Sequence, residues 1–315
     1  MNAERYDNRY ADEWRALRSE SEKEARLHGG VVRNSVMAAT ENGAFFGAGY
    51  LIRGQGRFYH LAFDVDTRDL RSIDAAEALL HALTAFFETE IRTSEPDAVL
   101  RLWAHDTMKS YGRFLRSFGF RVSDRMDIME RDLSAAEWLR GSGRTEDSRA
   151  RASVLSNNAS ISGLDLSNGA SISEFDLSDG DAMRAYVDAT ERAFTIPDRA
   201  DEMRYRISEC GAEVLAVTER SGRFPVSFLT YWPIDEQTAA TENIFTEEAC
   251  RRRGYAGALL DEAAHRIRQD GRTTARLTVY QSDKEAIALY EAKGYKKTAT
   301  LFEYHYFPRR KRFAS

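Results

Sequence analysis

The stretch "TEEACRRRGYAGALL", Thr246 to Leu260, places three arginines and two glycines where a helix begins. Glycine costs about 1 kcal/mol in a helix interior and neighbouring like charges repel one another, so helix stability does not explain this composition. Forked arginine donors suit phosphate groups, and Gly254 allows the backbone to approach an anion because it has no Cβ. We therefore interpret the stretch as an anion-binding loop that fits a pyrophosphate.

The residues after Gly254 have the periodicity of an amphipathic helix. Apolar side chains recur at spacings of three and four, at Ala256, Leu259, Leu260, Ala263 and Ile267. This stripe predicts that one face of the helix packs on a sheet and that its first turn projects beyond the sheet. The unpaired backbone N–H groups and the positive dipole end of that turn favour a bound anion.

Composition limits the class of protein. A chain of 315 residues exceeds the usual size of one hydrophobic core, so two domains are expected. The net charge of −5 lacks the basic field of a nucleic-acid-binding protein, and no apolar run is long enough for a membrane span or a signal peptide. Cys210 and Cys250 build no disulfide framework and match no zinc-ligand spacing. We therefore expect a cytoplasmic protein without a nucleic-acid partner, a membrane or a metal.

A segment rich in Ser, Gly, Asn and Asp divides the chain. This composition favours turns, so residues 141–169 are expected to link a domain of residues 1–140 to one of residues 170–315. Within this region "ASISGLDLSNG" at 159–169 is followed at once by "ASISEFDLSDG" at 170–180. The second copy is predicted as the first strand of the C-terminal domain. The first copy is either extra linker sequence left by a local duplication or an added strand of the N-terminal domain.

Both domains are predicted to be α+β. For the C-terminal domain, the pattern after the first strand predicts two helices, then strands at 213–219, 226–232 and 241–246, a helix at 254–269, a strand at 275–280, a helix at 283–293 and a strand at 299–307. For the N-terminal domain it predicts strands at 33–40, 44–53 and 58–65, a helix at 74–90, a strand at 99–105, a helix at 108–119 and a strand at 127–133. The meander that precedes the helices indicates a mixed, mostly antiparallel sheet in each domain, flanked by helices.

Two short matches suggest that the domains are copies of one fold. "AEALL" at 76–80 aligns with "AGALL" at 256–260, an offset of 256 − 76 = 180. "RSFGF" at 116–120 aligns with "EAKGY" at 291–295, an offset of 291 − 116 = 175. The two offsets differ by the length of one short loop, as a duplication predicts.

Three motifs, in their order and spacing, resemble those of the GNAT superfamily of acyl-CoA-dependent N-acyltransferases. They are "ENIFT" at Glu242–Thr246, "RRRGYAGALL" at Arg251–Leu260 and "DKEAIALYEAKGY" at Asp283–Tyr295. The resemblance implies two tandem GNAT-like domains, with acetyl-CoA bound as cosubstrate by the C-terminal one. It further implies that the strand ending at Thr246 separates from the following strand and leaves a slot for the pantetheine arm. The tandem layout is similar to that of the mycothiol synthases.

The resemblance also assigns roles to individual residues. The coenzyme-binding residues that it implies are Ile244, Phe245, Thr246, Arg251, Arg252, Arg253, Gly254, Tyr255, Ala256, Asp283 and Tyr290. Tyr290 stands where the family has its usual general acid, and a phenol with a pKa of about 10 keeps its proton at neutral pH. Glu242 is the candidate general base, on either face of its strand. The family usually has Asn at the position of Asp283. Ser282 and Glu285 have the spacing of a capping box.

The N-terminal domain lacks the corresponding groups. Its aligned loop reads "RSIDAA", with Asp74 at the position of Gly254, and Leu115 stands at the position of Tyr290. A carboxylate repels a pyrophosphate and leucine donates no proton. We therefore interpret this half as a degenerate copy.

The sequence thus predicts an acetyl-CoA-dependent N-acetyltransferase, acting on a primary amine of a small molecule or peptide by direct attack on the thioester. Acidic side chains near residues 194–206 favour a cationic acceptor in that region. One alternative is a non-catalytic acyl-CoA-binding regulatory pseudo-enzyme. Another is an aminoacyl-tRNA-dependent peptidyl ligase, a class that also uses paired GNAT-like domains, although the pI of about 5.8 speaks against it.

Overall fold

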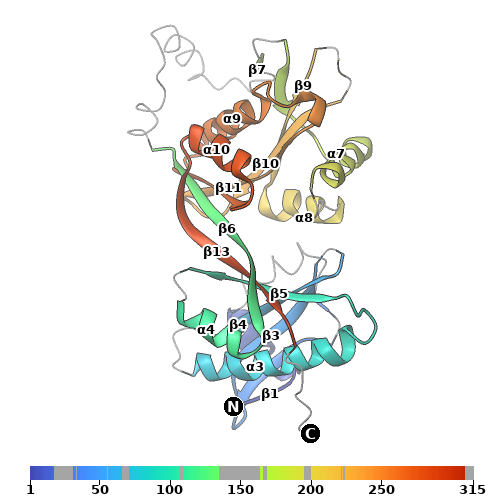
Figure 1. Cartoon of the computed structure of the whole chain (residues 1–315), viewed down its shortest axis with the longest axis vertical. Helices are drawn as coiled ribbons and strands as arrows, with labels where there is room; N and C mark the ends of the chain where they lie inside the picture. Colours follow the sequence, from blue (N-terminus) through green and yellow to red (C-terminus); the bar gives the residue numbers. More distant parts are fainter. Residues whose placement is uncertain are drawn as a thin grey trace. The chain divides into compact units, whose positions relative to one another are not determined.

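A computed structural model gives the structure of the chain in two compact units (Figure 1). The N-terminal unit comprises Met1–Arg125 and Thr300–Ser315, and the C-terminal unit comprises Met126–Ala299. The structure describes residues 1–17, 31–32, 34–54, 56–65, 71–106, 109–134, 164–165, 169–194, 200–220, 222 and 224–308.

The C-terminal unit is built on a mixed sheet with the strand order β13-β6-β12-β11-β10-β9-β8-β7. Its elements are β7 (Leu164–Asp165), β8 (Ser171–Glu174), α7 (Gly180–Ala193), α8 (Ala200–Cys210), β9 (Glu213–Thr218), β10 (Ser227–Pro233), β11 (Thr238–Thr246), η3 (Glu248–Cys250), α9 (Tyr255–Gln269), β12 (Thr274–Tyr280) and α10 (Lys284–Ala292), with parts of β6 (Phe120–Asp132) and β13 (Lys296–Tyr306). Helices α7 and α8 cover one face of the sheet and α9 and α10 cover the other (Figure 1).

Helix α9 packs on the sheet through the apolar stripe that the sequence predicts. Leu259, Leu260, Ala263 and Ile267 are buried in the core between the helix and β10–β12, and Ala256 is half-buried. Burying one leucine side chain stabilises a fold by about 1.5–3 kcal/mol. The stripe therefore fixes the helix axis and holds its first turn at the sheet edge.

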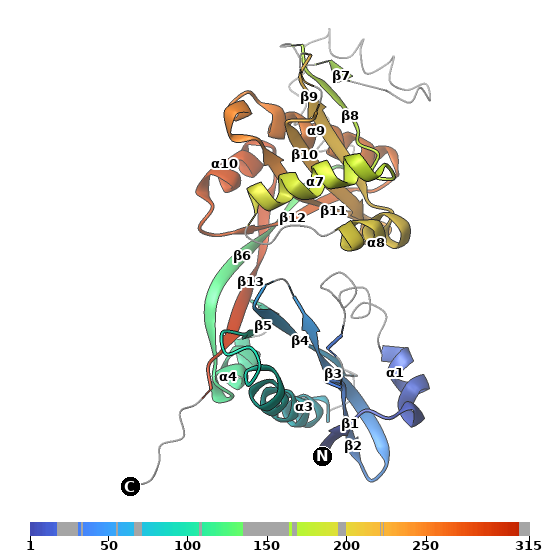
Figure 2. The same cartoon turned by 90° about the vertical axis from the view of Figure 1, so that its right-hand side faces the viewer.

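The N-terminal unit repeats this architecture, with the strand order β1-β2-β3-β4-β5-β13-β6. Its elements are β1 (Asn2–Arg5), η1 (Asn8–Tyr10), α1 (Ala11–Leu17), β2 (Met37–Glu41), β3 (Ala44–Arg53), β4 (Phe58–Val65), α3 (Ser72–Phe86), the π-helical turn η2 (Phe87–Ile91), β5 (Val99–His105) and α4 (Lys109–Ser117). Helices α3 and α4 lie on one face and α1 on the other (Figure 2). The expected strands and helices are all present, while β1 was not predicted.

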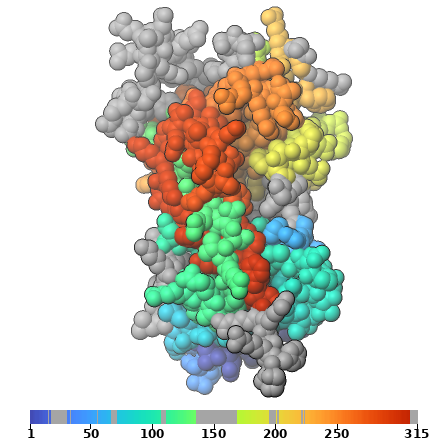
Figure 3. All heavy atoms as spheres, viewed as in Figure 1, coloured from blue at the N-terminus to red at the C-terminus, as the bar shows by residue number. Residues whose placement is uncertain are grey.

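Two long strands contribute to both units. Residues Met126–Asp132 of β6 pair antiparallel with β12 in the C-terminal unit, and Leu301–His305 of β13 pair antiparallel with β5 in the N-terminal unit. Figure 3 shows the green atoms of β6 beside the red atoms of β13. The units therefore differ from the expected domains 1–140 and 170–315, because hydrophobic alternation identifies a strand without identifying the strand beside it.

The described part of the expected linker belongs to the C-terminal unit. Leu164 and Asp165 form β7, which pairs antiparallel with β8 so that Leu164 faces Ile172 and Asp165 faces Ser171. The two copies of the repeat thus pair with each other. The prediction that the first copy adds a strand to the N-terminal domain is wrong for these residues, and residues 141–163 and 166–168 lie outside the described residues.

Candidate active site

Strand β11 contains an irregularity at its centre. Its antiparallel register with β10 shifts between two pairs, Phe228 with Phe245 and Thr230 with Glu242. Strand β11 has one more residue than β10 between these pairs, which makes a β-bulge. The bulge includes Asn243, whose φ is 51°. Asparagine tolerates this left-handed conformation better than most residues, so the sequence locally supports the bulge.

The pairing of β11 with β12 ends before the bulge. Thr238–Ala240 pair in parallel with Thr274–Arg276, and the pairing of these two described strands ends there. The following residue, Thr241, reaches the Arg276 carbonyl only through its side-chain Oγ1, at 3.3 Å. The separation that the family resemblance implies is therefore present from Glu242 onward.

The end of β11 directs backbone groups toward this separation. The N–H of Glu247 donates to the carbonyl of Val226 on the β10 side, at 2.9 Å. Since backbone groups alternate in direction along an antiparallel strand, those of Ile244 and Thr246 point to the β12 side. This arrangement suits an extended ligand that forms strand-like hydrogen bonds.

The loop before α9 has an unusual backbone. Arg252 has φ 64°, and Gly254, the N-cap residue of α9, has φ 84° without a side-chain cap. Left-handed residues at the start of a helix turn consecutive N–H groups toward one side, which forms a concave anion site. A Cβ at Gly254 would meet no atom within 4 Å, so the space above it is open. This geometry fits the predicted pyrophosphate.

The three arginines of this loop have different environments. Arg253 pairs with Glu219 through Nη1 at 2.7 Å, and the Tyr255 hydroxyl donates to the same carboxylate at 2.8 Å. The Nε of Arg251 donates to the Thr246 carbonyl at 3.2 Å. Within the described part of the chain, Arg252 has no side-chain partner. Arg252 is therefore the arginine best placed to reach a ligand, and Glu219 is a loop-holding residue that no motif indicated.

Helix α10 begins at Asp283. The side chain of Asp283 accepts a hydrogen bond from the N–H of Ala286 at 3.0 Å. Asp283, and not Ser282 of the expected capping box, is thus the N-cap residue. Aspartate and asparagine cap helices about equally well, so the departure from the family's Asn preserves this local role.

Tyr290 lies on the inner face of α10. Its side chain is 9% exposed and its ring lies 6.1 Å from the ring of Tyr295, centroid to centroid. Burial raises the pKa of Tyr290, and Asp283 and Tyr295 raise it further. The hydroxyl forms no hydrogen bond with the residues that the structure describes. It therefore keeps its proton at neutral pH and can donate it to an incoming group.

Glu242 lies on the α7 face of the sheet. It is paired with Thr230, whose Oγ1 lies 2.9 Å from the hydroxyl of Tyr186 on α7. Directly opposed residues of two antiparallel strands share a face, which resolves the alternation that the sequence left open. Asn243 Nδ2 reaches the same hydroxyl at 3.5 Å. Tyr186, Thr230 and Asn243 form a polar group beside Glu242 that no sequence motif predicted.

The other expected coenzyme-binding residues occupy both faces of the sheet. Ile244 packs in the α9 core and Phe245 in the α7 core, as neighbours on a strand do. Thr246 Oγ1 lies 2.8 Å from Ser227 Oγ. Ala256 is half-buried in the first turn of α9. These residues can offer a ligand their backbone more readily than their side chains.

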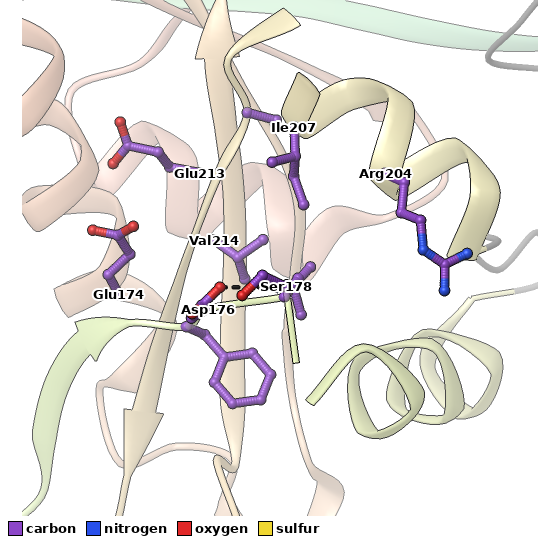
Figure 4. Close-up of a pocket in the computed structure, with 10 residues that line it drawn as sticks. Glu174, Asp176, Ser178, Arg204, Ile207, Glu213 and Val214 are labelled. Atoms are coloured by element: carbon purple, nitrogen blue, oxygen red, sulfur yellow. Dashed lines mark hydrogen bonds between the residues drawn. The ribbon is translucent and has the colours of Figure 1, made fainter. Parts of the chain in front are cut away.

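A separate pocket lies where β8 leads into α7 (Figure 4). Glu174, Asp176 and Glu213 line it together with Arg204 of α8. Asp176 accepts a hydrogen bond from the Ser178 N–H at 2.8 Å, and this bond lowers the pKa of Asp176. None of the expected coenzyme-binding residues lines this pocket.

In the N-terminal unit the corresponding helix begins earlier. The buried residues Ala75, Leu79 and Leu80 of α3 match Tyr255, Leu259 and Leu260 of α9 at the offset of 180. Residues 72–74 are therefore already helical where 252–254 form the loop. The N-cap residue Arg71 has φ −81°, so the left-handed loop is missing there.

Helices α4 and α10 correspond at the second offset, since 284 − 109 and 292 − 117 both equal 175. Each is followed by a left-handed glycine, Gly119 with φ 97° and Gly294 with φ 84°. Leu115, at the position of Tyr290, is fully buried. The duplication read from two short matches is thus visible in the helices themselves.

Among the described residues, no helix is long and apolar enough to cross a membrane. The same part of the chain holds no cluster of three metal-ligating side chains.

Comparison with known proteins agrees with this geometry. Residues 183–295 match the acetyltransferase (GNAT) family. No curated protein matches the chain. The matched segment contains the bulge of β11, the loop before α9 and Tyr290.

Solved structures share the fold of nearly the whole chain. A GCN5-related N-acetyltransferase from Sphaerobacter thermophilus is 14% identical with a TM-score of 0.64, over 96% of this chain and 94% of that one. A tandem GNAT protein from the clavulanic acid biosynthesis pathway is 12% identical with a TM-score of 0.58, over 87% and 83%. A GCN5-related N-acetyltransferase from Kribbella flavida is 14% identical with a TM-score of 0.52, over 93% and 96%.

Proposed function

We propose that the chain is an acyltransferase of the GNAT superfamily and that its C-terminal unit transfers an acetyl group from acetyl-CoA to a primary amine of a small molecule or peptide. The match of residues 183–295 to the GNAT family and the fold shared with a tandem GNAT protein support this proposal. The observation that carries this proposal is the left-handed loop at Arg252 and Gly254. It lies at the start of α9 and follows the part of β11 that pairs with β10 but no longer with β12.

Binding of acetyl-CoA would use mainly backbone groups. The N–H groups from Arg252 to Ala256 would hold the pyrophosphate, with Arg252 adding a guanidinium. The backbone of Ile244 and Thr246 would pair with the pantetheine arm. Asp283 would act indirectly, by fixing the first turn of α10.

The proposed reaction is a direct transfer. The amine nitrogen attacks the thioester carbonyl, the C–N bond forms, and the C–S bond breaks to release the thiol. Glu242 would accept a proton from the amine, directly or through water, and Tyr290 would donate one to the leaving sulfur. Backbone N–H groups at the bulge would stabilise charge on the carbonyl oxygen. The raised pKa of Tyr290 keeps its hydroxyl protonated at neutral pH, so the proton that this step requires is present.

The acceptor would approach from the α7 face, where Glu242 lies beside Tyr186 and Asn243. The expectation of a cationic acceptor near residues 194–206 stays a prediction, because residues 195–199 lie outside the described part of the chain. We further propose a cytoplasmic location. The described cysteines, Cys210 and Cys250, form no disulfide, which fits that compartment.

The test is incubation with acetyl-CoA and a panel of amines, amino acids and peptides, with thiol release as the readout. We expect release that depends on at least one amine. Tight acetyl-CoA binding without release across the panel would instead support a regulatory pseudo-enzyme. Binding of tRNA without binding of acetyl-CoA would support a peptidyl ligase.

A further inference from the structure

Residues Met126–Asp132 of β6 lie outside the segment that matches the family and contact elements that carry the proposed acyl-transfer site. Asp127, on this strand, is 9% exposed. Its carboxylate accepts a hydrogen bond from Gln281 Nε2 at 2.6 Å and pairs with Lys297 Nζ at 2.7 Å. A nearly buried carboxylate held by two such partners forms strong, orienting bonds.

Gln281 lies in the short segment that connects β12 to α10. It follows the last residue of β12, Tyr280, and precedes by two residues Asp283, the N-cap residue of α10. The first residues of a helix determine its direction. The bond from Asp127 to Gln281 therefore fixes the segment between β12 and α10, and with it the orientation of α10. Tyr290 is two turns along this helix.

A second contact from the same strand reaches the other helix of the site. Arg131 Nη1 pairs with Asp261 of α9 at 3.0 Å. Asp261 also pairs with Lys293 Nζ at 2.6 Å, and Lys293 is the C-cap residue of α10. Strand β6 is thus bonded through Asp127 to the segment that precedes α10, and it is linked through Arg131 and Asp261 to the C-cap residue of α10.

We propose that β6 positions the acyl-transfer site of the C-terminal unit, with Asp127 as a positioning residue that acts through Gln281. The inference rests on the proposed function for its kinetic consequence only. These residues of β6 precede the segment that matches the family and belong to the C-terminal unit, where they would orient the helix that carries Tyr290.

The same strand offers a matched control. Glu130 of β6 pairs with Arg276 of β12 through Oε1 and Nε, at 2.7 Å. Glu130→Ala removes the same charge and an ion pair of similar length, but its partner lies within β12 rather than at the start of α10. The pair Asp127→Ala and Glu130→Ala therefore separates positioning of α10 from general loss of strand contacts.

The first measurement is amide hydrogen exchange of the full-length chain without ligand. In Asp127→Ala we expect exchange of residues 281–290 to rise by roughly fivefold or more relative to Glu130→Ala, as local opening becomes easier. Asp127→Asn, which keeps the side-chain volume, serves if the alanine variant folds poorly, and should show a smaller rise. Equal exchange of this segment in the two alanine variants would overturn the proposal.

The second measurement is a double-mutant cycle on turnover. We expect Asp127→Ala and Gln281→Ala each to lower kcat by roughly fivefold. The double variant should lose little more than Asp127→Ala alone, because Asp127→Ala already breaks the bond to Gln281 together with the ion pair to Lys297. Independent, multiplying losses would contradict action through Gln281. If the wild-type chain releases no thiol, the proposed function fails, while hydrogen exchange still decides whether Asp127 positions α10.

Discussion

The two halves of this chain share the order of their main strands, but among the described residues the left-handed loop that precedes α9 has no counterpart before α3. In both, the parallel pair at the sheet centre forms over three residues, Phe58–His60 with Val99–Arg101 in the first half and Thr238–Ala240 with Thr274–Arg276 in the second. The short parallel pair is therefore common to both halves and does not account for the loop before α9. The halves differ in where the next helix begins. Residues 252–254 form a loop before α9, whereas the corresponding residues 72–74 are the first turn of α3.

The central strands also differ. The β3–β4 register is regular throughout, whereas β10–β11 is interrupted by the bulge at Asn243. In the first half the buried Asp64 of β4 accepts a hydrogen bond from Trp14 Nε1 of α1 at 2.7 Å. Helix α1 is thus bonded to the sheet through a buried carboxylate. In the second half, α7 is bonded to the sheet through Tyr186 and Thr230, and Glu242 is half-buried. The two halves therefore differ in backbone as well as in side chains.

The largest expected effect is on the loop itself. Gly254→Asp should abolish acetyl-CoA binding, because it adds a carboxylate facing the phosphates and a side chain at φ 84°. Isothermal titration calorimetry measures the loss, and circular dichroism checks that the variant is folded. Gly254→Asn is the matched control, since asparagine tolerates the left-handed region without adding charge, and it should bind weakly rather than not at all. Wild-type affinity in the Asp variant would refute the assignment of the loop.

Leu115, which stands at the position of Tyr290 in the first half, should contribute to stability and not to catalysis. Leu115 is fully buried, so Leu115→Ala should lower the free energy of unfolding by about 2–5 kcal/mol. Urea denaturation measures this change. The kcat of the folded fraction should stay at the wild-type value, and a selective loss of kcat would give the first half a part in the chemistry.

Tyr290→Phe should have the opposite profile. It removes the proton donor and keeps the ring, so kcat should fall by roughly tenfold or more, about 1.4 kcal/mol in the activation free energy, with unchanged acetyl-CoA affinity. Steady-state kinetics and calorimetry measure the two quantities. Tyr295→Phe is the matched control on the neighbouring buried ring and should preserve kcat. An unchanged rate in Tyr290→Phe would remove this hydroxyl from the mechanism.

Restoring the glycine in the first half should not restore binding. Asp74 is exposed in the first turn of α3, so Asp74→Gly should cost about 1 kcal/mol of stability. No second acetyl-CoA site should appear, because the backbone at this position remains helical. A stoichiometry of two in calorimetry would mean that the side chain alone had blocked the site.

The smallest effect concerns pH. A buried tyrosine with a raised pKa keeps its proton while the unfolded chain loses it near pH 10, so the stabilisation is complete below about pH 10 and is lost as pH rises further. This applies to Tyr290 and to Tyr295, whose pKa burial raises to about 12. We expect kcat to hold from neutral pH to about pH 9.5. A decrease of kcat within that pH range in the wild-type chain, absent in Tyr290→Phe, would contradict the raised pKa of Tyr290.

The sequence predicted elements well because their signals are local. The apolar stripe of α9, the alternation of the strands and the Arg-x-x-Gly-x-Ala spacing each lie within one short segment. They were sufficient to locate the loop at Arg252–Gly254 and the helix of Tyr290. The offset of 180 was also recoverable, because the same face of a helix is buried in both halves.

Other features depended on contacts between distant segments. Nothing in "DIMERDL" at 127–133 indicates that it pairs with β12, and nothing near Glu219 indicates that it holds Arg253 and Tyr255. The face of Glu242 required the register with Thr230. The shift that creates the bulge is a property of two strands together, so neither strand predicts it alone.

The placement of β13 has a consequence for synthesis of the chain on the ribosome. The N-terminal unit pairs β5 with residues 301–305, and the buried Arg101 and Glu303, 3.5 Å apart, are separated by 202 residues. The first half translated therefore lacks a central strand until nearly the whole chain has emerged. We expect the N-terminal unit to be completed last, after most of the C-terminal unit has been translated.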